Sequence, residues 1–294
     1  MTTQPADDDA AVLLRELLPD GVLVLTFNRP ARNNAWNLEL EEAYFGALTD
    51  ATTDPVVRAI VVTGAGRTFC PGMDFQQLSA SVNEGQHSTQ TRRPMTLATK
   101  VPKPVIAAIN GACAGIGMIQ ALSTDVRFAA RGAKLTTAFA RRGLFAENGS
   151  SWLLSRLVGS GVAMDLLLSG RVIDADEAHH LGLVNFVSEP GRALDDAIAY
   201  ASDMAANCSP RSLETIKAQV FQDLERSLDE GRLGALQLLP GFRDTPDFKE
   251  GVNSYMEKRP PSFAGVSRKL TDEREAMPSP SSVGRPFRCR GRGC

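Results

Sequence analysis

The chain has 294 residues, 43% of them hydrophobic, and its 32 lysines and arginines against 34 aspartates and glutamates give a formal net charge of −2. This length buries a substantial core, and the near-neutral charge argues against a nucleic-acid binder, which normally carries a basic face. The five cysteines form no CxxC pair and the three histidines show no metal-ligand spacing. We therefore expect neither a disulfide framework nor a metal site.

The longest apolar stretches, such as residues 21–27 and 105–109, are far shorter than the roughly 20 residues of a membrane-spanning helix. The acidic N-terminus also lacks the basic and apolar regions of a signal peptide. We expect a cytoplasmic protein that binds neither membranes nor nucleic acid.

Strands and helices alternate along the first two thirds of the chain, which favours a mostly parallel α/β arrangement. Beyond residue 193 the strand patterns end, and two long amphipathic runs predict a helical region. The predicted strands are residues 22–28, 59–63, 105–109, 126–129 and 184–187, and the predicted helices are residues 37–48, 115–122, 194–207 and 212–228.

This pattern divides the chain into four parts. Residues 1–11 are predicted to be a flexible N-terminus, residues 12–192 an α/β core and residues 193–268 a helical region. Residues 269–294 are predicted to be a disordered tail, because a segment rich in Pro, Ser, Gly and Arg buries too little apolar surface to order itself.

Three glycine-rich segments follow predicted strands: residues 64–74 (GAGRTFCPGMD), 110–117 (NGACAGIG) and 147–151 (ENGSS). None of them matches the P-loop or the dinucleotide-binding fingerprint. Two such loops at strand ends would present free backbone N–H groups to one oxyanion. A tight turn or close helix packing explains a single loop of this kind equally well.

Five motifs resemble, in order and spacing, the enoyl-CoA hydratase/isomerase (crotonase) family over residues 12–268. They are NRP (28–30) with NA (34–35), IVVTGAGRTFCPGMD (60–74), KPVIAAINGACAGIGM (103–118) with TDVR (124–127), GLFAENGSSWLLSRLVG (143–159) and GLVN (182–185). The resemblance implies a crotonase-like α/β spiral of ββα units with a C-terminal helical trimerisation region. It also implies a homotrimer or a dimer of trimers. An acyl-CoA thioester would be the substrate, with no cofactor, because coenzyme A is part of that substrate.

The resemblance further implies that the backbone N–H groups of Met73 and Ile116 hold the thioester carbonyl. Two preorganised donors in a dry pocket stabilise an enolate oxygen by about 2.7–4 kcal/mol each. Such donors need close backbone approach, which we expect from Gly72, Gly115 and Gly117.

Hydratases of the family use two glutamates, whose positions are occupied here by Ile119 and Phe139. Hydration needs a base for the water and an acid for C2, so the loss of both carboxylates argues against it. Glu147 stands where several Δ3,Δ2-enoyl-CoA isomerases of the family carry a single catalytic glutamate. With Phe139 and Phe145 as apolar walls, a dry pocket would raise the pKa of Glu147.

Other interpretations of these residues stay open. Glu147 also suits the start of a helix through the helix dipole alone. Asp74 is a candidate second acid near the carbonyl, and equally a turn or cap residue.

Coenzyme A recognition is implied less specifically. The resemblance places Asn34 and Ala35 at the adenine pocket and makes Arg29, Arg32 and Lys258 candidates for phosphate contacts. Solvated surface charge is the alternative for each basic side chain.

The leading hypothesis is an acyl-CoA enzyme that shifts a 3-enoyl double bond to the 2-position with Glu147 as acid and base. A hydratase in which Glu147 acts with Asp74 or a water is the first alternative. A non-catalytic acyl-CoA-binding homologue is the second. A thioester hydrolase or a C–C bond cleaving enzyme is a third, since the same oxyanion hole serves those reactions.

Overall fold

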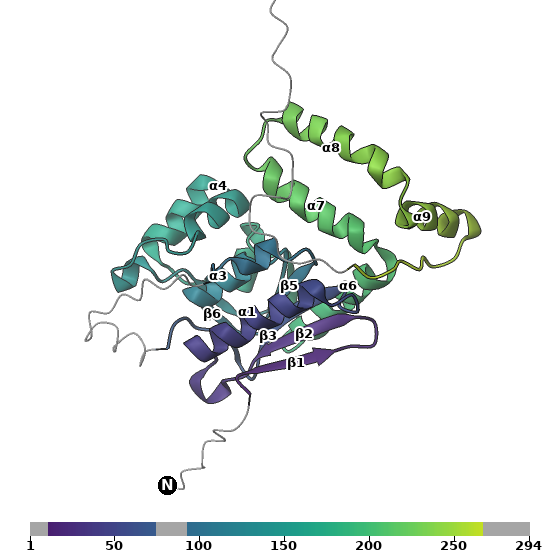
Figure 1. Ribbon diagram of the computed structural model, residues 1–294. Coiled ribbons are helices and arrows are strands. Elements are labelled where there is room, and N and C mark those ends of the chain that lie inside the picture. Colours follow the sequence, from purple (N-terminus) through teal and green to yellow (C-terminus); the bar gives the residue numbers. More distant parts are fainter. Residues whose placement is uncertain (1–10, 75–92, 267–294) are drawn as a thin grey trace, which may run out of the picture.

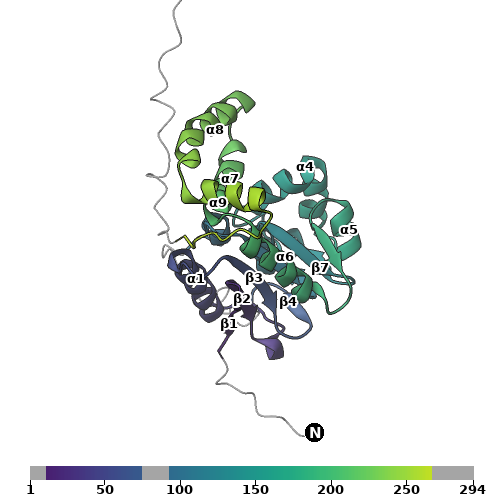
Figure 2. The same cartoon turned by 90° about the vertical axis from the view of Figure 1, so that its right-hand side faces the viewer.

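Two β-sheets and the helices around them make up the part of the chain that the computed structural model describes, residues 11–74 and 93–266 (Figures 1 and 2). The predicted disordered tail and nearly all of the predicted flexible N-terminus lie outside these residues. The six-stranded sheet has the order β1-β2-β3-β5-β7-β10 and the four-stranded sheet the order β4-β6-β8-β9. The strands are β1 Leu13–Leu17, β2 Val22–Phe27, β3 Ala59–Gly64, β4 Thr68–Cys70, β5 Val105–Ile109, β6 Ala112–Ala114, β7 Val126–Ala130, β8 Lys134–Thr136, β9 Ile173–Asp174 and β10 Phe186–Ser188.

From β3 to β8, successive strands alternate between the two sheets. Strands β3, β5 and β7 lie in the larger sheet and β4, β6 and β8 in the smaller one, and within each sheet these strands are parallel. This is the spiral of ββα units that the resemblance implies. Because parallel neighbours end at the same edge of a sheet, the segments that follow β4 and β6 leave side by side.

The helices cover the sheets and extend beyond them. Helix α1 begins at an Asn37 side chain that accepts from the Leu40 amide, and it buries Leu40, Tyr44 and Leu48 at a spacing of four residues. The helices are α1 Leu38–Thr53, α3 Ile116–Leu122, α4 Ser150–Ser169, α5 Ala175–His180, α6 Ala193–Asn207, α7 Pro210–Asp223, α8 Leu228–Arg243 and α9 Pro246–Glu257, with 3-10 turns η1 Pro30–Arg32, η2 Leu97–Lys100 and η3 Ala140–Arg142.

Four predicted strands match β2, β3, β5 and β7 within one residue at either end. The fifth, predicted at residues 184–187, begins two residues later as β10. The run at residues 212–228, predicted as one helix, is divided between two. Helix α7 ends at Asp223, and Ser227 starts α8 through a capping box with Glu230.

Helix α6 belongs to the core, although its residues fall in the helical region predicted from residue 193. Its alanines at positions 193, 197, 201 and 205 are buried, and the helix packs on β3, β5 and β7. The helices that extend away from the sheets are α7, α8 and α9 (Figure 1). The small alanine side chains let α6 lie close to the sheet.

Helix α4 is long and apolar enough to cross a membrane, and it is the one such helix among residues 11–74 and 93–266. The lengths of the apolar runs in the sequence predicted no membrane-spanning helix. Gly159, with φ +76° and ψ 160°, interrupts the helix near its middle. Its first half contributes Leu153 and Leu154 to the hydrophobic core. Only 22% of the apolar window of α4 is buried, and one such helix is weak evidence for a membrane span; we interpret α4 as a kinked helix that packs on the core with part of its surface.

Lys217 on α7 contacts η2 and the segments that precede β5 and β7. Its ammonium group donates to Asp125 Oδ2 at 2.8 Å and to the carbonyl oxygens of Ala98 and Lys103 at 3.0 and 3.2 Å. Burial lowers the pKa of Lys217, and the carboxylate of Asp125 opposes that shift. The ammonium group is therefore held by three oxygens from segments far apart in the chain.

Replacing Lys217 with methionine should lower the free energy of unfolding by about 3 kcal/mol, because it leaves a partly buried carboxylate without its partner. The value lies at the low end for such pairs since Asp125 keeps its hydrogen bond from the Val105 amide. Urea unfolding followed by circular dichroism measures it. A change below about 0.5 kcal/mol would show that the pair contributes no more than a surface ion pair.

Candidate active site

The segments after β4 and β6 are in backbone contact. Gly72 has φ +118°, and a Cβ built on it would lie 3.4 Å from the Ala114 carbonyl oxygen. A Cβ built on Gly115, at φ +52°, would lie 3.7 Å from the Gly72 Cα. On Gly117 a Cβ would lie 2.0 Å from the Cys70 carbonyl oxygen, so no side chain fits there. The three glycines stand where two backbones pass closely.

The amides of Met73 and Ile116 follow directly on these glycines. Trp36 forms backbone hydrogen bonds with the residues on either side of Met73. The Trp36 N–H donates to the Gly72 oxygen at 2.8 Å, and the Trp36 oxygen accepts from the Asp74 N–H at 2.9 Å. The N–H of Met73 therefore points away from Trp36. Ile116 is the first residue of α3, where a backbone N–H has no partner within the helix. Neither amide donates to an acceptor in the described part of the chain.

Glu147 stands at the first position of a tight turn that leads into α4. The Ser150 N–H donates to the Glu147 carbonyl oxygen at 2.9 Å. Between them Asn148 and Gly149 both have left-handed φ, +52° and +74°, as in a type I′ turn. Glu147 is half-buried, and burial raises the pKa of its carboxyl group. Helix α4 packs on α3, which begins at Ile116.

The two positions of the hydratase glutamates lie in the hydrophobic core. Ile119 is 0% exposed and Phe139 is 5% exposed. Phe145, expected as an apolar wall beside Glu147, is instead 76% exposed. It lies in the loop between η3 and the turn before α4, where the chain runs over the surface. The burial of Glu147 therefore does not come from Phe145 in the single chain.

Asp74, the candidate second acid, is paired with Arg29. The Arg29 Nη2 lies 3.0 Å from Asp74 Oδ2, and the Arg29 guanidinium also donates to the Ala35 carbonyl oxygen. Both side chains are largely buried, with 16% and 9% of their surface exposed. This pair ties the segment before α1 to the first glycine-rich loop. Arg29 is thus turned inward and away from the role of a phosphate contact.

Residues 18–266 match the family model described as enoyl-CoA hydratase/isomerase. The chain belongs to the enoyl-CoA hydratase/isomerase family. It is 34% identical to a 1,2-epoxyphenylacetyl-CoA isomerase from Escherichia coli, over 83% of this chain and 95% of that protein. It is 35% identical to an (E)-benzylidenesuccinyl-CoA hydratase from Thauera aromatica, over 83% of this chain and 96% of that protein. A solved enoyl-CoA hydratase from Polaromonas sp. JS666 superposes with a TM-score of 0.80 at 31% identity, over 85% of this chain and 99% of that structure.

Of the residues that family resemblance places around coenzyme A, Asn34 is the most constrained. It is 0% exposed, and its Nδ2 donates to the carbonyl oxygens of Ala65 and Thr68 at 2.9 and 2.6 Å. Asn34 therefore shapes the first glycine-rich loop from within. Ala35 is half-buried next to it. Arg32 on η1 and Lys258 at the end of α9 are exposed.

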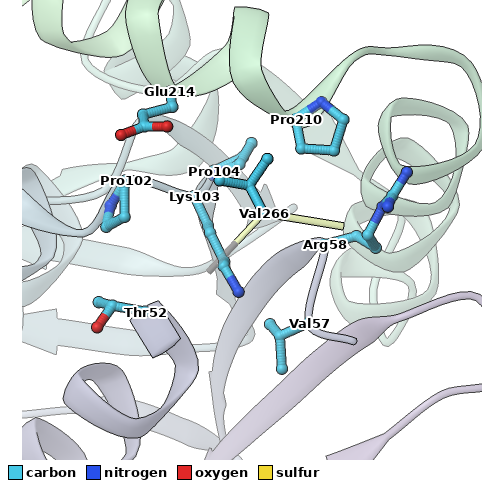
Figure 3. A pocket seen from close by; sticks show the side chains of 9 residues that line it. All are labelled: Thr52, Val57, Arg58, Pro102, Lys103, Pro104, Pro210, Glu214 and Val266. Atoms are coloured by element: carbon cyan, nitrogen blue, oxygen red, sulfur yellow. The ribbon is translucent and has the colours of Figure 1, made fainter. Parts of the chain in front are cut away.

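A cavity between Lys103 and the start of α7 in this enoyl-CoA hydratase/isomerase is too small to hold an acyl-CoA. Its volume of about 10 Å³ suits one water at most. Burial lowers the pKa of Lys103 in its wall to about 8, and the Lys103 Nζ donates to the Asp54 carbonyl oxygen. The other lining residues are Thr52, Val57, Arg58, Pro102, Pro104, Pro210, Glu214 and Val266 (Figure 3).

Sequence analysis missed two residues of this region. Trp36 fixes the direction of the Met73 amide, but only its two backbone hydrogen bonds reveal this role, and no side-chain pattern signals it. Ser150 belongs to the ENGSS segment, yet the sequence does not show that its hydroxyl is buried without a partner among residues 11–74 and 93–266.

Proposed function

We propose that this chain isomerises a 3-enoyl-CoA to the 2-enoyl-CoA, with Glu147 as its single acid and base. The observation that carries the proposal is the contrast between carboxylate positions. The two hydratase positions hold the buried side chains of Ile119 and Phe139, and Asp74 is paired with Arg29. Glu147 is half-buried with a raised pKa, which suits a group that must both take and return a proton.

A single carboxylate is enough for both proton transfers of the isomerisation. Glu147 takes a proton from C2, and the electron pair moves so that the thioester becomes a dienolate. The N–H groups of Met73 and Ile116 donate to its oxygen, the place where negative charge develops. Glu147 then returns the proton to C4, which leaves the double bond between C2 and C3. No water enters the reaction, in keeping with buried apolar side chains at the two hydratase positions.

Hydration remains the second candidate, because the relative from Thauera aromatica is named a hydratase. Incubating the protein with 2-enoyl-CoA and 3-enoyl-CoA of several chain lengths separates the two. The proposal expects conjugated thioester absorbance to rise from 3-enoyl-CoA and 2-enoyl-CoA to gain no water. Formation of 3-hydroxyacyl-CoA from 2-enoyl-CoA would support the hydratase, and binding without turnover of either would identify a non-catalytic homologue.

We also propose that the chain assembles as a homotrimer or a dimer of trimers through its C-terminal helices. Helices α7 and α8 have no buried residue in the single chain, and α9 buries only Ser254. A groove of about 410 Å³, lined mostly by apolar side chains, runs between α4 and α7. The exposed apolar residues of the three helices include Ile216, Val220, Leu233, Leu236, Leu239, Phe248 and Val252.

Burying these faces in closed symmetry accounts for helices that are too apolar for solvent. Light scattering at micromolar concentration should give three or six times the mass of one chain. A stable monomer at that concentration would contradict this assembly.

Contacts of Arg32 and Lys258 with the coenzyme A phosphates remain a prediction, and so does a cytoplasmic location.

A further inference from the structure

The hydroxyl of Ser150 is buried without a hydrogen-bond partner. Ser150 is 0% exposed, and no described residue accepts from or donates to its Oγ. Buried polar groups are nearly always hydrogen-bonded, so an unpaired hydroxyl in a folded interior needs an explanation. Ser150 is the first residue of α4, three residues after Glu147.

The turn between the two residues brings them together. In a tight turn whose fourth N–H donates to the first carbonyl, the first and last Cα atoms lie within about 7 Å. The 2.9 Å hydrogen bond from the Ser150 N–H to the Glu147 oxygen closes such a turn. A glutamate side chain can bridge that separation by rotation about its own bonds.

The Glu147 carboxylate lacks a partner as well, since it accepts no hydrogen bond and forms no ion pair within residues 11–74 and 93–266. Burial is the sole cause of its raised pKa. Helix α3 carries no charged residue, η3 carries Arg141 and Arg142, and α4 carries Arg156 and Asp165; the Arg141 guanidinium donates to the Ser169 oxygen at the far end of α4.

A donor without an acceptor and an acceptor without a donor thus share one turn. We infer that Ser150 is a positioning residue for Glu147, whose hydroxyl donates to the carboxylate when Glu147 turns toward the bound thioester. The inference rests on the proposed function. Such a bond orients one oxygen of the carboxylate and leaves the other for the C2 and C4 protons. It also favours the ionised form that takes the first proton.

The described fold also holds a buried acceptor that lacks a hydrogen-bond partner on α3, the helix that packs on α4. Gln120 Oε1 is likewise buried without a partner, while its Nε2 donates to the Met95 oxygen at 3.1 Å. Thr96, the next residue, lies 3.8 Å from a Cβ built on Gly149. A bond from Ser150 to Gln120 would be purely structural, and the experiment must tell the two apart.

The pH dependence of kcat for 3-enoyl-CoA isomerisation distinguishes them, because it reports ionisation in the substrate complex. With Ser150→Ala the ionised carboxylate loses a donor, so its pKa rises. The acidic limb of the pH profile of kcat should move up by about one pH unit, and kcat should fall about tenfold. Ser150→Thr restores the hydroxyl and should restore the limb. The matched control is Ser155→Ala, since Ser155 Oγ already donates to the Trp152 oxygen at 3.2 Å; it should change neither.

An acidic limb that stays in place while Ser150→Ala only lowers the melting temperature would overturn the inference and show that the hydroxyl has a purely structural role. Failure of the proposed function looks different, because the wild type then converts no 3-enoyl-CoA. In that case carbon NMR of Glu147 with a saturated acyl-CoA bound gives the pKa directly. A rise in Ser150→Ala would support the inference without any turnover, and an unchanged value would overturn it.

Discussion

Glu147→Gln is expected to abolish the conversion of 3-enoyl-CoA to 2-enoyl-CoA while acyl-CoA affinity changes by no more than a few-fold. The amide keeps the size and polarity of the side chain but takes no proton. A general acid–base group typically contributes about 10²–10⁴-fold, and here one carboxylate serves both proton transfers, so the loss should lie at the upper end. Stopped assays of conjugated thioester absorbance, with affinity measured by calorimetry, test both halves of the expectation.

The sign of the pH dependence follows from the role of Glu147 as a base. Activity requires the ionised carboxylate, so it rises as the pH rises through the pKa of Glu147. Because burial raises that pKa, the rise should lie above the range of an ordinary glutamate. An exposed glutamate on β1 supplies the control, and Glu16→Gln should leave turnover unchanged. Retention of more than about a tenth of wild-type turnover by Glu147→Gln would remove Glu147 from the mechanism.

Gly117→Ala should have the second-largest effect, through the oxyanion site. Its Cβ would lie 2.0 Å from the Cys70 carbonyl oxygen, so β4 and α3 must move apart. That movement separates the Ile116 amide from the Met73 amide. Misplacing one oxyanion donor costs about 10²–10³ in kcat. Steady-state kinetics of a variant whose circular dichroism is native measures this loss.

Gly161→Ala on α4 is the matched control, because a Cβ there meets no atom within 4 Å and Gly161 has no positive φ. It should leave kcat unchanged. If Gly117→Ala folds and keeps wild-type kcat, the close approach of the two loops has no part in the reaction. If it fails to fold, Ile116→Pro tests the same donor, since proline lacks the N–H and suits the first position of a helix.

Five strands of the larger sheet were predictable, whereas its edge strand β1, with a single buried residue, and the smaller sheet were not, for a physical reason. Strands such as β3 and β5 are buried runs of five or six residues, AIVVTG and VIAAI, with a clear apolar pattern. Strands β4, β6 and β8 have three residues each, and two of them lie inside glycine-rich segments. A run that short carries no periodicity, so only its pairing with neighbours makes it a strand.

The candidate site was predictable where it depends on backbone and not where it depends on packing. Gly72, Gly115 and Gly117 mark close approach in the sequence itself, and the structure brings their loops into contact. The pairing of Asp74 with Arg29 joins residues 45 positions apart, and no local pattern encodes it. The exposure of Phe145 likewise depends on where the chain leaves η3, which the sequence does not show.

A crystal structure of Glu147→Gln with a 3-enoyl-CoA bound tests the central claim most directly. The account predicts that the thioester oxygen lies about 2.7–3.1 Å from both the Met73 and the Ile116 nitrogen atoms. The side chain at position 147 should face C2 and C4, with no water between them. A thioester oxygen held by other groups, or a side chain at position 147 turned away from the acyl chain, would contradict it.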